Sequence, residues 1–314
     1  MLRVLFLLAL WVFYAFGDAH IFVYHRFGDD RYPSTNISTQ KLKEQFDYFK
    51  ENGYEVIPLS RLVDALKKGE EILDNWIVLT IDDNYHSFYK NGLGVFKEYG
   101  YPFSLFVYVK AAEKKYGDYS SWDELREIAK FGSVEFHSYG HAHMSRFSKE
   151  ELEEDFKKGL ELFEKEMGFK PKYFTHPYGE FNEELIEVAK SFGFSALINQ
   201  NMGAVSSSSN PYDLDRTALG ESSNLKEFLN YKYLNAKWIE PSIYPEDGIL
   251  KEIKAVLSSE VKKAGLYVTG NGWRELEVKD GKVSKDLNLK LNHERVRLIL
   301  SVGNSISTKI LTKD

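Results

Sequence analysis

Between residues 21 and 198 the sequence alternates apolar runs with amphipathic segments, and this alternation constrains the fold more than any other feature. The apolar runs predict about seven strands, which read IFVY, YEVIPL, WIVLTI, FSLFVYV, VEFH, KYFTH and FSALI. Helical periodicity fills the intervals, over residues 39–53, 60–69, 92–100, 121–132, 148–168 and 182–193. Strands that are apolar nearly throughout are typical of a parallel sheet covered on both faces. The pattern therefore predicts an α/β fold, either a (β/α) barrel or a doubly wound sheet, and we expect a distorted seven-stranded barrel.

Two of these helices carry residues that mark their ends. Ser148 followed by Glu151 forms the pattern of a capping box at the start of the longest helix. Ser60 is the expected N-cap of the segment 60–69, and Gly69 is its expected end.

After about residue 240 the pattern changes to short segments that predict antiparallel strands. These segments read GLYVTG, WRELEV, KVSKDLNLKL, VRLILSV and STKIL, with KDGK and GNG as turns between them. We therefore expect two domains, a larger one over residues 18–240 and a small all-β, sandwich-like one of unknown role over residues 241–314.

The first residues resemble an export signal. Arg3 precedes an apolar run from Val4 to Phe16, and the small residues Ala15 and Gly17 stand at the spacing of a cleavage site before Asp18. We expect residues 1–17 to be a signal peptide and the mature chain to be periplasmic, on the cell surface or secreted, with no stable membrane span after cleavage. An uncleaved N-terminal anchor is the alternative.

Composition excludes several classes of function. The chain of 314 residues contains no cysteine, which rules out thiolate nucleophiles, cysteine-ligated zinc and disulfides. Its net charge of −6 argues against a broad nucleic-acid-binding surface. The oligomeric state is not predicted.

Two adjacent carboxylates stand at the end of one predicted strand. Asp82 and Asp83 follow the apolar run WIVLTI. Two such groups repel each other unless a cation or a proton relieves them. They either cap the following turn or perform chemistry.

Histidines at a second strand end favour chemistry. The segment VEFHSYGHAH places His137 at the end of a strand and His141 four residues later. Two imidazoles and the Asp83 carboxylate would leave open positions on a metal ion, as a catalytic zinc site requires. Asp82, beside them, could then act as a general base on a water molecule.

A third strand end carries FTHPYGEFN. Pro177 sets a rigid turn there, and the Tyr178 backbone amide could act as an oxyanion donor. His176 precedes this turn, and the sequence leaves open whether it lines the cleft.

The segments TIDDN, HSYGH and HPYG, in this order, resemble the motifs of the polysaccharide deacetylases of the NodB-homology type, carbohydrate esterase family 4. The resemblance covers about residues 20 to 220. It implies that the first aspartate is the base, that the second binds metal with both histidines, and that a tyrosine amide helps hold the oxyanion. Carried over residue by residue, these are Asp82, Asp83, His137, His141 and Tyr178.

The chain departs from the family pattern in three places. Asn84 replaces a glycine, which is a mild change because asparagine also tolerates left-handed turns. Thr175 replaces the arginine that usually orients the base, and Arg216 in LDRTAL is a candidate substitute. The family's L-x-x-H motif, which supplies the general acid, does not follow residue 200. The segment FVYHRFGDDRYPSTNIS resembles the opening of the branch that deacetylates poly-β-1,6-N-acetylglucosamine, which implies that His25 is the acid.

The predicted function is that of a metal-dependent N-deacetylase, a hydrolase that releases acetate from N-acetylglucosamine units of an extracellular polysaccharide. Poly-β-1,6-N-acetylglucosamine of a biofilm matrix is the first substrate, and chitin or peptidoglycan is the alternative. The expected cofactor is Zn²⁺, with Co²⁺, Ni²⁺ or Fe²⁺ as alternatives, and the expected partner is the N-acetylated polysaccharide, with no nucleic acid. A catalytically decayed carbohydrate-binding protein and a non-haem iron oxygenase remain as other interpretations.

Overall fold

The computed structural model describes residues 17–313. The predicted signal peptide, except for Gly17, lies outside the described residues. Within residues 17–313, no helix combines the length and the apolar character needed to cross a membrane.

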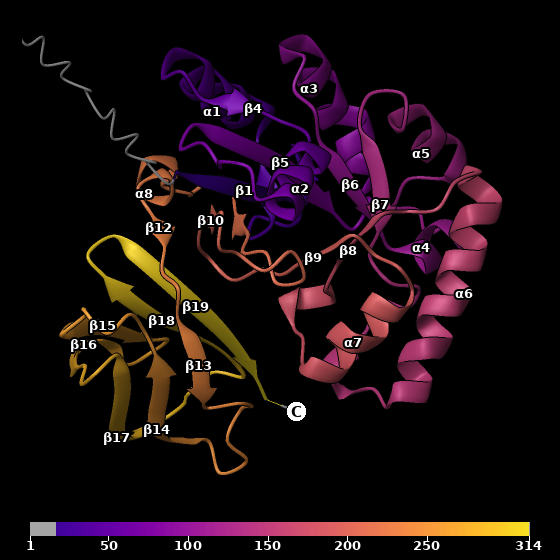
Figure 1. Cartoon of the computed structure of the whole chain (residues 1–314). Helices are drawn as coiled ribbons and strands as arrows, with labels where there is room; N and C mark the ends of the chain where they lie inside the picture. The colour runs from indigo at the N-terminus through magenta and orange to yellow at the C-terminus, as the bar shows by residue number, and fades with distance from the viewer. Residues whose placement is uncertain (1–16, 314) are drawn as a thin grey trace, which may run out of the picture.

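A curled, mostly parallel sheet forms the larger part of the molecule (Figure 1). Its main path runs β10-β1-β5-β6-β7-β8-β9, with β11 paired to β1 and β4 paired to β5. Only β10 is antiparallel to its neighbour. The strands are β1 (Asp18–Tyr24), β4 (Glu55–Val56), β5 (Trp76–Asp82), β6 (Ser104–Val107), β7 (Ser133–Phe136), β8 (Tyr173–Thr175), β9 (Ala196–Ile198), β10 (Val205–Ser206) and β11 (Thr217–Ala218). This seven-stranded half-barrel confirms the expected distorted barrel.

Helices connect the parallel strands, and those labelled α3, α5, α6 and α7 lie along the outer side of the sheet in Figure 1. The helices are α1 (Thr39–Glu51), α2 (Leu59–Lys68), α3 (Leu93–Tyr99), α4 (Val109–Glu113), α5 (Trp122–Ile128), α6 (Lys149–Met167), α7 (Glu183–Ser191) and α8 (Leu225–Leu229). A π-helical turn, η1 (Phe88–Gly92), precedes α3, and short 3₁₀ turns occur at η2 (Met144–Arg146) and η3 (Pro177–Gly179). The sequence did not indicate α4 or the π turn.

The predicted helix ends are partly confirmed. Ser148 and Glu151 form the expected capping box at the start of α6. Gly69 ends α2 in the left-handed conformation, as expected. The prediction of Ser60 as N-cap is wrong, because Pro58 holds that position and makes no side-chain cap. Proline fixes φ at a value that suits an N-cap, so the cap of α2 lies two residues earlier than predicted and has no hydroxyl.

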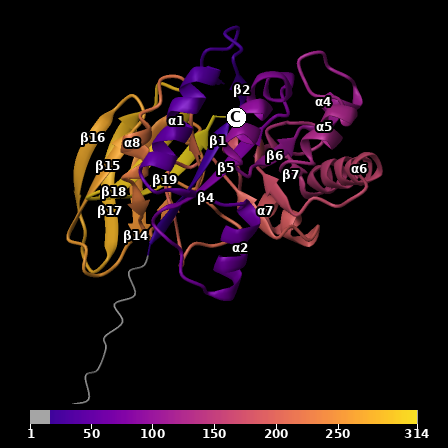
Figure 2. The same cartoon turned by 90° about the horizontal axis from the view of Figure 1, so that it is seen from above.

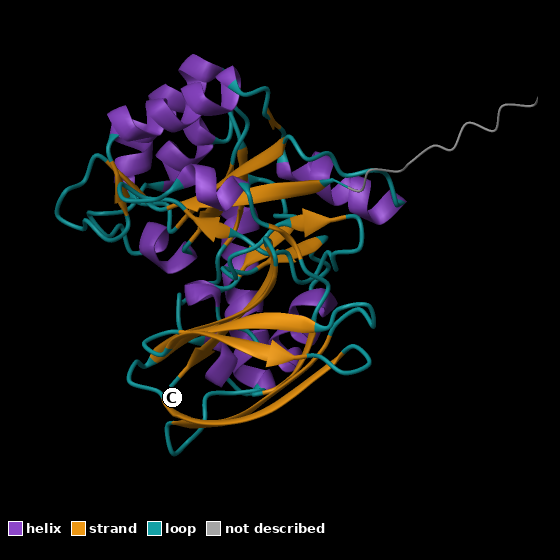
Figure 3. Cartoon of the chain, turned by 90° about the vertical axis from the view of Figure 1, so that its left-hand side faces the viewer, coloured by secondary structure: helices purple, strands orange, loops and turns teal. Residues whose placement is uncertain are grey.

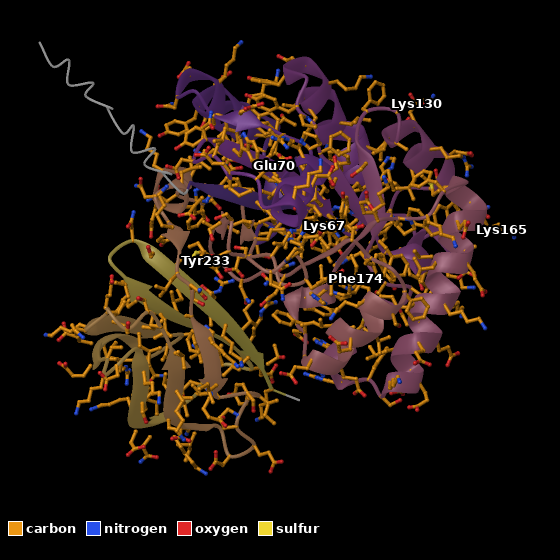
Figure 4. The ribbon with its side chains drawn as sticks, in the orientation of Figure 1. Lys67, Glu70, Lys130, Lys165, Phe174 and Tyr233 are labelled. Carbon is orange, nitrogen blue, oxygen red and sulfur yellow. The ribbon has the colours of Figure 1, made fainter. Side chains whose placement is uncertain are left out.

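Both faces of the parallel sheet are buried, which explains the apolar strands. On β1, the side chains of Phe22 and Tyr24 join a large aromatic core that also includes residues of the outer helices. Ala19 and Ile21 alternate with them and join a second core, which includes the apolar side of α2. Phe174, which is labelled in Figure 4, is fully buried in the first of these cores. Alternate residues along β1 therefore belong to two different cores, one on each face of the sheet.

The C-terminal part consists of two further sheets, which we call the C-terminal β unit (residues 232–312). One sheet has the order β12-β19-β18-β15-β16, and the other has the order β13-β14-β17. Their strands are β12 (Lys232–Tyr233), β13 (Lys237–Glu240), β14 (Ile249–Val256), β15 (Lys263–Val268), β16 (Gly272–Glu277), β17 (Lys282–Lys290), β18 (Arg295–Val302) and β19 (Ser305–Thr312). Apolar side chains from both sheets form one separate core between them. The small two-stranded pair β2 (Arg26–Phe27) and β3 (Asn36–Ile37) belongs to the larger part.

The C-terminal β unit lies to one side of the half-barrel (Figures 2 and 3) and is joined to it by hydrogen bonds. The Tyr233 amide donates to Asp18 Oδ2 at 3.2 Å, and Thr308 Oγ1 donates to the Met202 carbonyl at 2.7 Å. The C-terminal sheets agree with the expected all-β part, while the domain boundary at residue 240 and the sandwich-like domain stay predictions.

Candidate active site

The site lies at the carboxyl ends of the parallel strands, where this class of fold places functional residues. Asp82 ends β5, His137 directly follows β7, and His25 directly follows β1. These strands run parallel in one sheet, in the order β1-β5-β6-β7, so their carboxyl ends lie along one edge.

A tight turn after β5 orients the two carboxylates differently. Asp83 and Asn84 have φ values of 71° and 41°, in the left-handed region. Asparagine tolerates this region better than most residues, so Asn84 can stand where the family pattern has glycine. The Asn84 side chain also accepts a hydrogen bond from the Tyr108 amide at 2.8 Å, which fixes the turn.

Asp83, His137 and His141 converge as predicted. The Nε2 atoms of His141 and His137 lie 2.8 and 3.4 Å from Asp83 Oδ1. That buried oxygen nevertheless accepts no hydrogen bond of acceptable geometry from any described residue. One possible ligand atom from each of Asp83, His137 and His141 lies within 4.8 Å of the other two, so all three can face one ion. Two imidazoles and one carboxylate are the ligand set of an open divalent metal site, so the residues fit a metal ion.

Thr175 holds one of these imidazoles in place. His137 Nδ1 lies 2.8 Å from the Thr175 carbonyl oxygen and 2.6 Å from its hydroxyl. Because a carbonyl only accepts, Nδ1 carries the proton and the Nε2 lone pair faces the cluster. Thr175 therefore orients a candidate ligand at the position where the family pattern has arginine.

Arg216 takes the place beside the candidate base, as the sequence suggested. Its Nη1 and Nη2 donate to Asp82 Oδ1 and Oδ2 at 2.8 and 2.7 Å, and both side chains are fully buried. The Asn199 carbonyl and the Thr80 hydroxyl accept two more hydrogen bonds from this guanidinium, at 3.0 and 3.1 Å. Burial alone would raise the pKa of Asp82, but Arg216 and His137 outweigh it and hold the pKa below its usual range. Asp82 is therefore a carboxylate at neutral pH.

His25 and Tyr178 line the same cleft as the cluster. Burial lowers the pKa of His25, although the charges of Asp83 and Asp82 oppose the shift. Tyr178 has a φ of 60°, an unusual conformation for a residue other than glycine and one that is often found at functional sites. Its ring lies 4.7 Å from that of His141, centroid to centroid.

The other histidines of these motifs have different surroundings. His143 binds Glu180 at 2.8 Å and stacks on Tyr178 with a centroid distance of 4.3 Å. His176 is buried between the rings of Phe174 and Phe181, and burial lowers its pKa to about 3. Of the two interpretations of His176, the structure favours a core residue.

The cleft has a volume of about 540 Å³ and includes residues that the sequence did not indicate. Gln200 lines it and donates from Nε2 to Asp82 Oδ2 at 3.4 Å. The segment 218–223 forms another part of its wall, and Arg295 reaches it from β18 of the C-terminal β unit. None of these positions belongs to a local motif, so only the folded chain identifies them.

Comparisons with known proteins agree with this geometry. Residues 71–197 match the family described as polysaccharide deacetylase. The poly-beta-1,6-N-acetyl-D-glucosamine N-deacetylase of Escherichia coli strain K12 is 26% identical over 242 residues, covering 64% of this chain and 36% of that protein. The match thus spans about a third of the length of that relative.

Solved structures share the fold. The Streptococcus pyogenes deacetylase PplD, determined in complex with acetate, superposes with a TM-score of 0.61 and 17% identity, covering 66% of this chain and 95% of that one. IcaB from Ammonifex degensii gives a TM-score of 0.59 and 22% identity, covering 68% and 94%. The motifs, the fold and the match over residues 71–197 agree, and this part of the chain is a polysaccharide deacetylase domain (NodB type, carbohydrate esterase family 4), a class of domain found in hydrolases that act on amide bonds.

Proposed function

We propose that this protein is a metal-dependent N-deacetylase that removes acetyl groups from N-acetylglucosamine units of an exported polysaccharide, with poly-β-1,6-N-acetylglucosamine as the substrate. One observation carries the proposal. A buried carboxylate, Asp82, is held ionised by Arg216 directly beside the converging Asp83, His137 and His141, at the edge of a cleft. This arrangement places a base next to a cation site that substrate can reach.

Asp83, His137 and His141 would hold the metal, with Zn²⁺ as the first candidate and Co²⁺, Ni²⁺ or Fe²⁺ as alternatives. Bound there, the cation would supply Lewis-acid chemistry, polarising the acetamide carbonyl and acidifying water. The absence of cysteine leaves imidazole and carboxylate as the protein's strongest zinc ligands.

The chain's own residues move the protons. Asp82 accepts a proton from water, whose oxygen adds to the acetamide carbonyl carbon. The Tyr178 backbone N–H donates to the oxygen that becomes negative. The carbon–nitrogen bond then breaks, the leaving nitrogen takes a proton from His25, and acetate and a free amine remain. Because burial lowers the pKa of His25, its imidazole is mostly neutral at neutral pH, and the proton that it gives to the nitrogen is the one that Asp82 has taken from water.

Two observations support the choice of polymer. The relative from Escherichia coli is named a poly-beta-1,6-N-acetyl-D-glucosamine N-deacetylase, and so is one from Staphylococcus aureus strain MSSA476 that is 21% identical over 230 residues. The candidate acid His25 occurs in the opening segment that resembles this branch. The predicted signal peptide would deliver the enzyme to an extracellular polymer.

The test is acetate release from β-1,6-linked N-acetylglucosamine oligomers by the zinc-loaded protein. Asp82→Asn keeps the size of the side chain but removes the base, so release should fall by at least about 100-fold. Asp123→Asn is the matched control, because the Asp123 side chain is 92% exposed on α5 and should leave release unchanged. If neither these oligomers nor chitin and peptidoglycan fragments lose acetate, the proposed function is wrong.

A further inference from the structure

We propose that the C-terminal β unit holds a second polysaccharide-binding site, a groove beside Trp273, and that this groove binds a distant part of the polymer whose sugar units enter the cleft. The inference rests on the proposed function for the identity of its ligand. The first observation is a large aromatic side chain that lies outside the core of the C-terminal β unit. The Trp273 side chain is 58% exposed on the edge strand β16, whereas Trp76 in the half-barrel is 4% exposed.

The tryptophan groove is a shallow hollow that is open to solvent. It has a volume of about 460 Å³ and lies between β15, β16 and the turn after β18, lined by Lys263, Gly265, Trp273, Glu275 and Ser301. Gly265 makes the floor, because a Cβ atom there would lie 2.5 Å from Ser301 Oγ and 3.3 Å from the Trp273 ring. Tyr267 supports the indole from the paired position on β15, at a centroid distance of 5.4 Å. The ring is thus fixed at the side of a groove that only a glycine leaves open.

The chemistry of this groove suits a sugar. One aromatic face is bordered by a hydroxyl from Ser301 and by the Lys263–Glu275 ion pair, whose atoms lie 2.7 Å apart. A pyranose ring combines an apolar face of C–H groups with hydroxyls around its edge, and it can stack on an indole while hydrogen bonding to such a border. A deacetylated unit adds an ammonium group, which an aromatic face and Glu275 also attract.

One strand carries residues of both the groove and the cleft. Arg295 and Ser301 both belong to β18, and Arg295 lines the cleft while Ser301 lines the groove. Ser301 stands six positions after Arg295, so both lie on the same face of a strand with a regular ladder to β19, about 20 Å apart. The middle of this face is buried against the half-barrel, because Ile299 pairs with Thr308, whose hydroxyl donates to the Met202 carbonyl. A polymer that occupied both hollows would therefore pass around this contact and would need several sugar units, whereas a disaccharide could not span them.

The test measures binding and turnover separately in the full chain. Binding of β-1,6-N-acetylglucosamine polymer, chitin and peptidoglycan fragments is measured by calorimetry in the Asp82→Asn background, without turnover. Adding Trp273→Ala should weaken polymer binding about tenfold, while Trp273→Phe should restore most of it. Ile243→Ala is the matched control, because Ile243 is 67% exposed in the same unit and does not line the groove.

In the active chain, Trp273→Ala should raise KM for the long polymer about tenfold, leave kcat unchanged and leave a disaccharide substrate unaffected. If Trp273→Ala binds all three polymers as tightly as the unaltered chain, the groove does not hold polysaccharide and the proposal is wrong. Failure of the proposed function looks different, because the unaltered chain would then release no acetate while the effect of Trp273 on binding could still be measured.

Discussion

At the scale of single residues, the pair Asp82–Arg216 shows how the fold maintains a charged carboxylate inside the protein. Both side chains are fully buried, and the guanidinium pairs with both carboxylate oxygens. Removing one partner of such a pair leaves an uncompensated buried charge, which costs more than removing both. The arginine thus serves both the stability of the fold and the ionisation of Asp82.

We expect Arg216→Met to lower the free energy of unfolding by about 3–5 kcal/mol, because Asp82 would be left as an unpaired buried carboxylate. The double variant Arg216→Met with Asp82→Asn should recover part of this loss, since it removes both charges. Urea unfolding of the four proteins of this cycle measures the coupling. Equal losses in the single and double variants would contradict the role of the ion pair.

A second residue, His20, should make the protein sensitive to mild acid. It is buried on β1, and burial lowers its pKa to about 4 in the folded protein, compared with about 6.5 in the unfolded chain. As the pH falls below about 6.5, His20 becomes protonated in the unfolded chain but stays neutral in the folded protein. Stability therefore decreases between about pH 6.5 and 4, by up to about 3 kcal/mol.

Replacing His20 with Phe should flatten this part of the stability profile. Chemical unfolding at pH 7 and pH 4.5 provides the measurement, and the difference between the two values should shrink in His20→Phe. His20 stacks on Phe22 with a centroid distance of 5.9 Å, so an aromatic replacement keeps this kind of contact. A variant that keeps the full acid loss would show that another group is responsible.

At the scale of elements, helix ends show where local sequence governs structure and where it does not. In α6, Ser148 Oγ accepts from the Glu151 amide at 3.3 Å and Glu151 Oε2 accepts from the Ser148 amide at 2.8 Å. In α2, Ser60 lies one residue inside the helix and is exposed, and no side chain caps the start. The same residue type therefore has different energetic roles in the two helices.

We expect Ser148→Ala to lower the free energy of unfolding by about 1 kcal/mol, because the Glu151 amide loses its acceptor. Ser60→Ala is the matched control and should change stability by less than about 0.5 kcal/mol. Thermal or urea unfolding compares the two. A loss of similar size in both variants would mean that hydroxyl removal acts in some way other than capping.

At the scale of the whole molecule, the candidate metal site joins segments that are distant in the sequence. Asp83 follows β5, while His137 and His141 follow β7. Only the folded chain brings the three ligand atoms together, so a metal that binds them stabilises the folded state alone.

Added Zn²⁺ should therefore raise the melting temperature, with a gain of about 2.7 kcal/mol at 100 times Kd. His141→Ala should remove the effect, because its Nε2 is one of the three converging atoms. His86→Ala is the control, since His86 pairs with Glu124 and does not belong to the cluster. Calorimetric unfolding with zinc and with a chelator decides, and an unchanged melting temperature would argue against a metal site.

The sequence by itself determined the parts of this protein that depend on local pattern. Apolar runs that alternate with amphipathic segments specify a curled α/β sheet. The strands bury both of their faces, and each helix buries one face against the sheet. The motifs around Asp82, His137 and Tyr178 mark the ends of strands, and parallel strands bring such ends to one edge. The roles of these residues, and of His25, stay predictions.

Only the tertiary structure decided which distant side chains complete the site. Arg216 reaches Asp82 across 134 positions, Thr175 holds His137 from the next strand, and Arg295 enters the cleft from the C-terminal β unit. A local sequence pattern does not predict such pairings, because they depend on the packing of several elements at once. Local sequence therefore marks the strand ends that carry the motifs, while packing selects the residues that meet there.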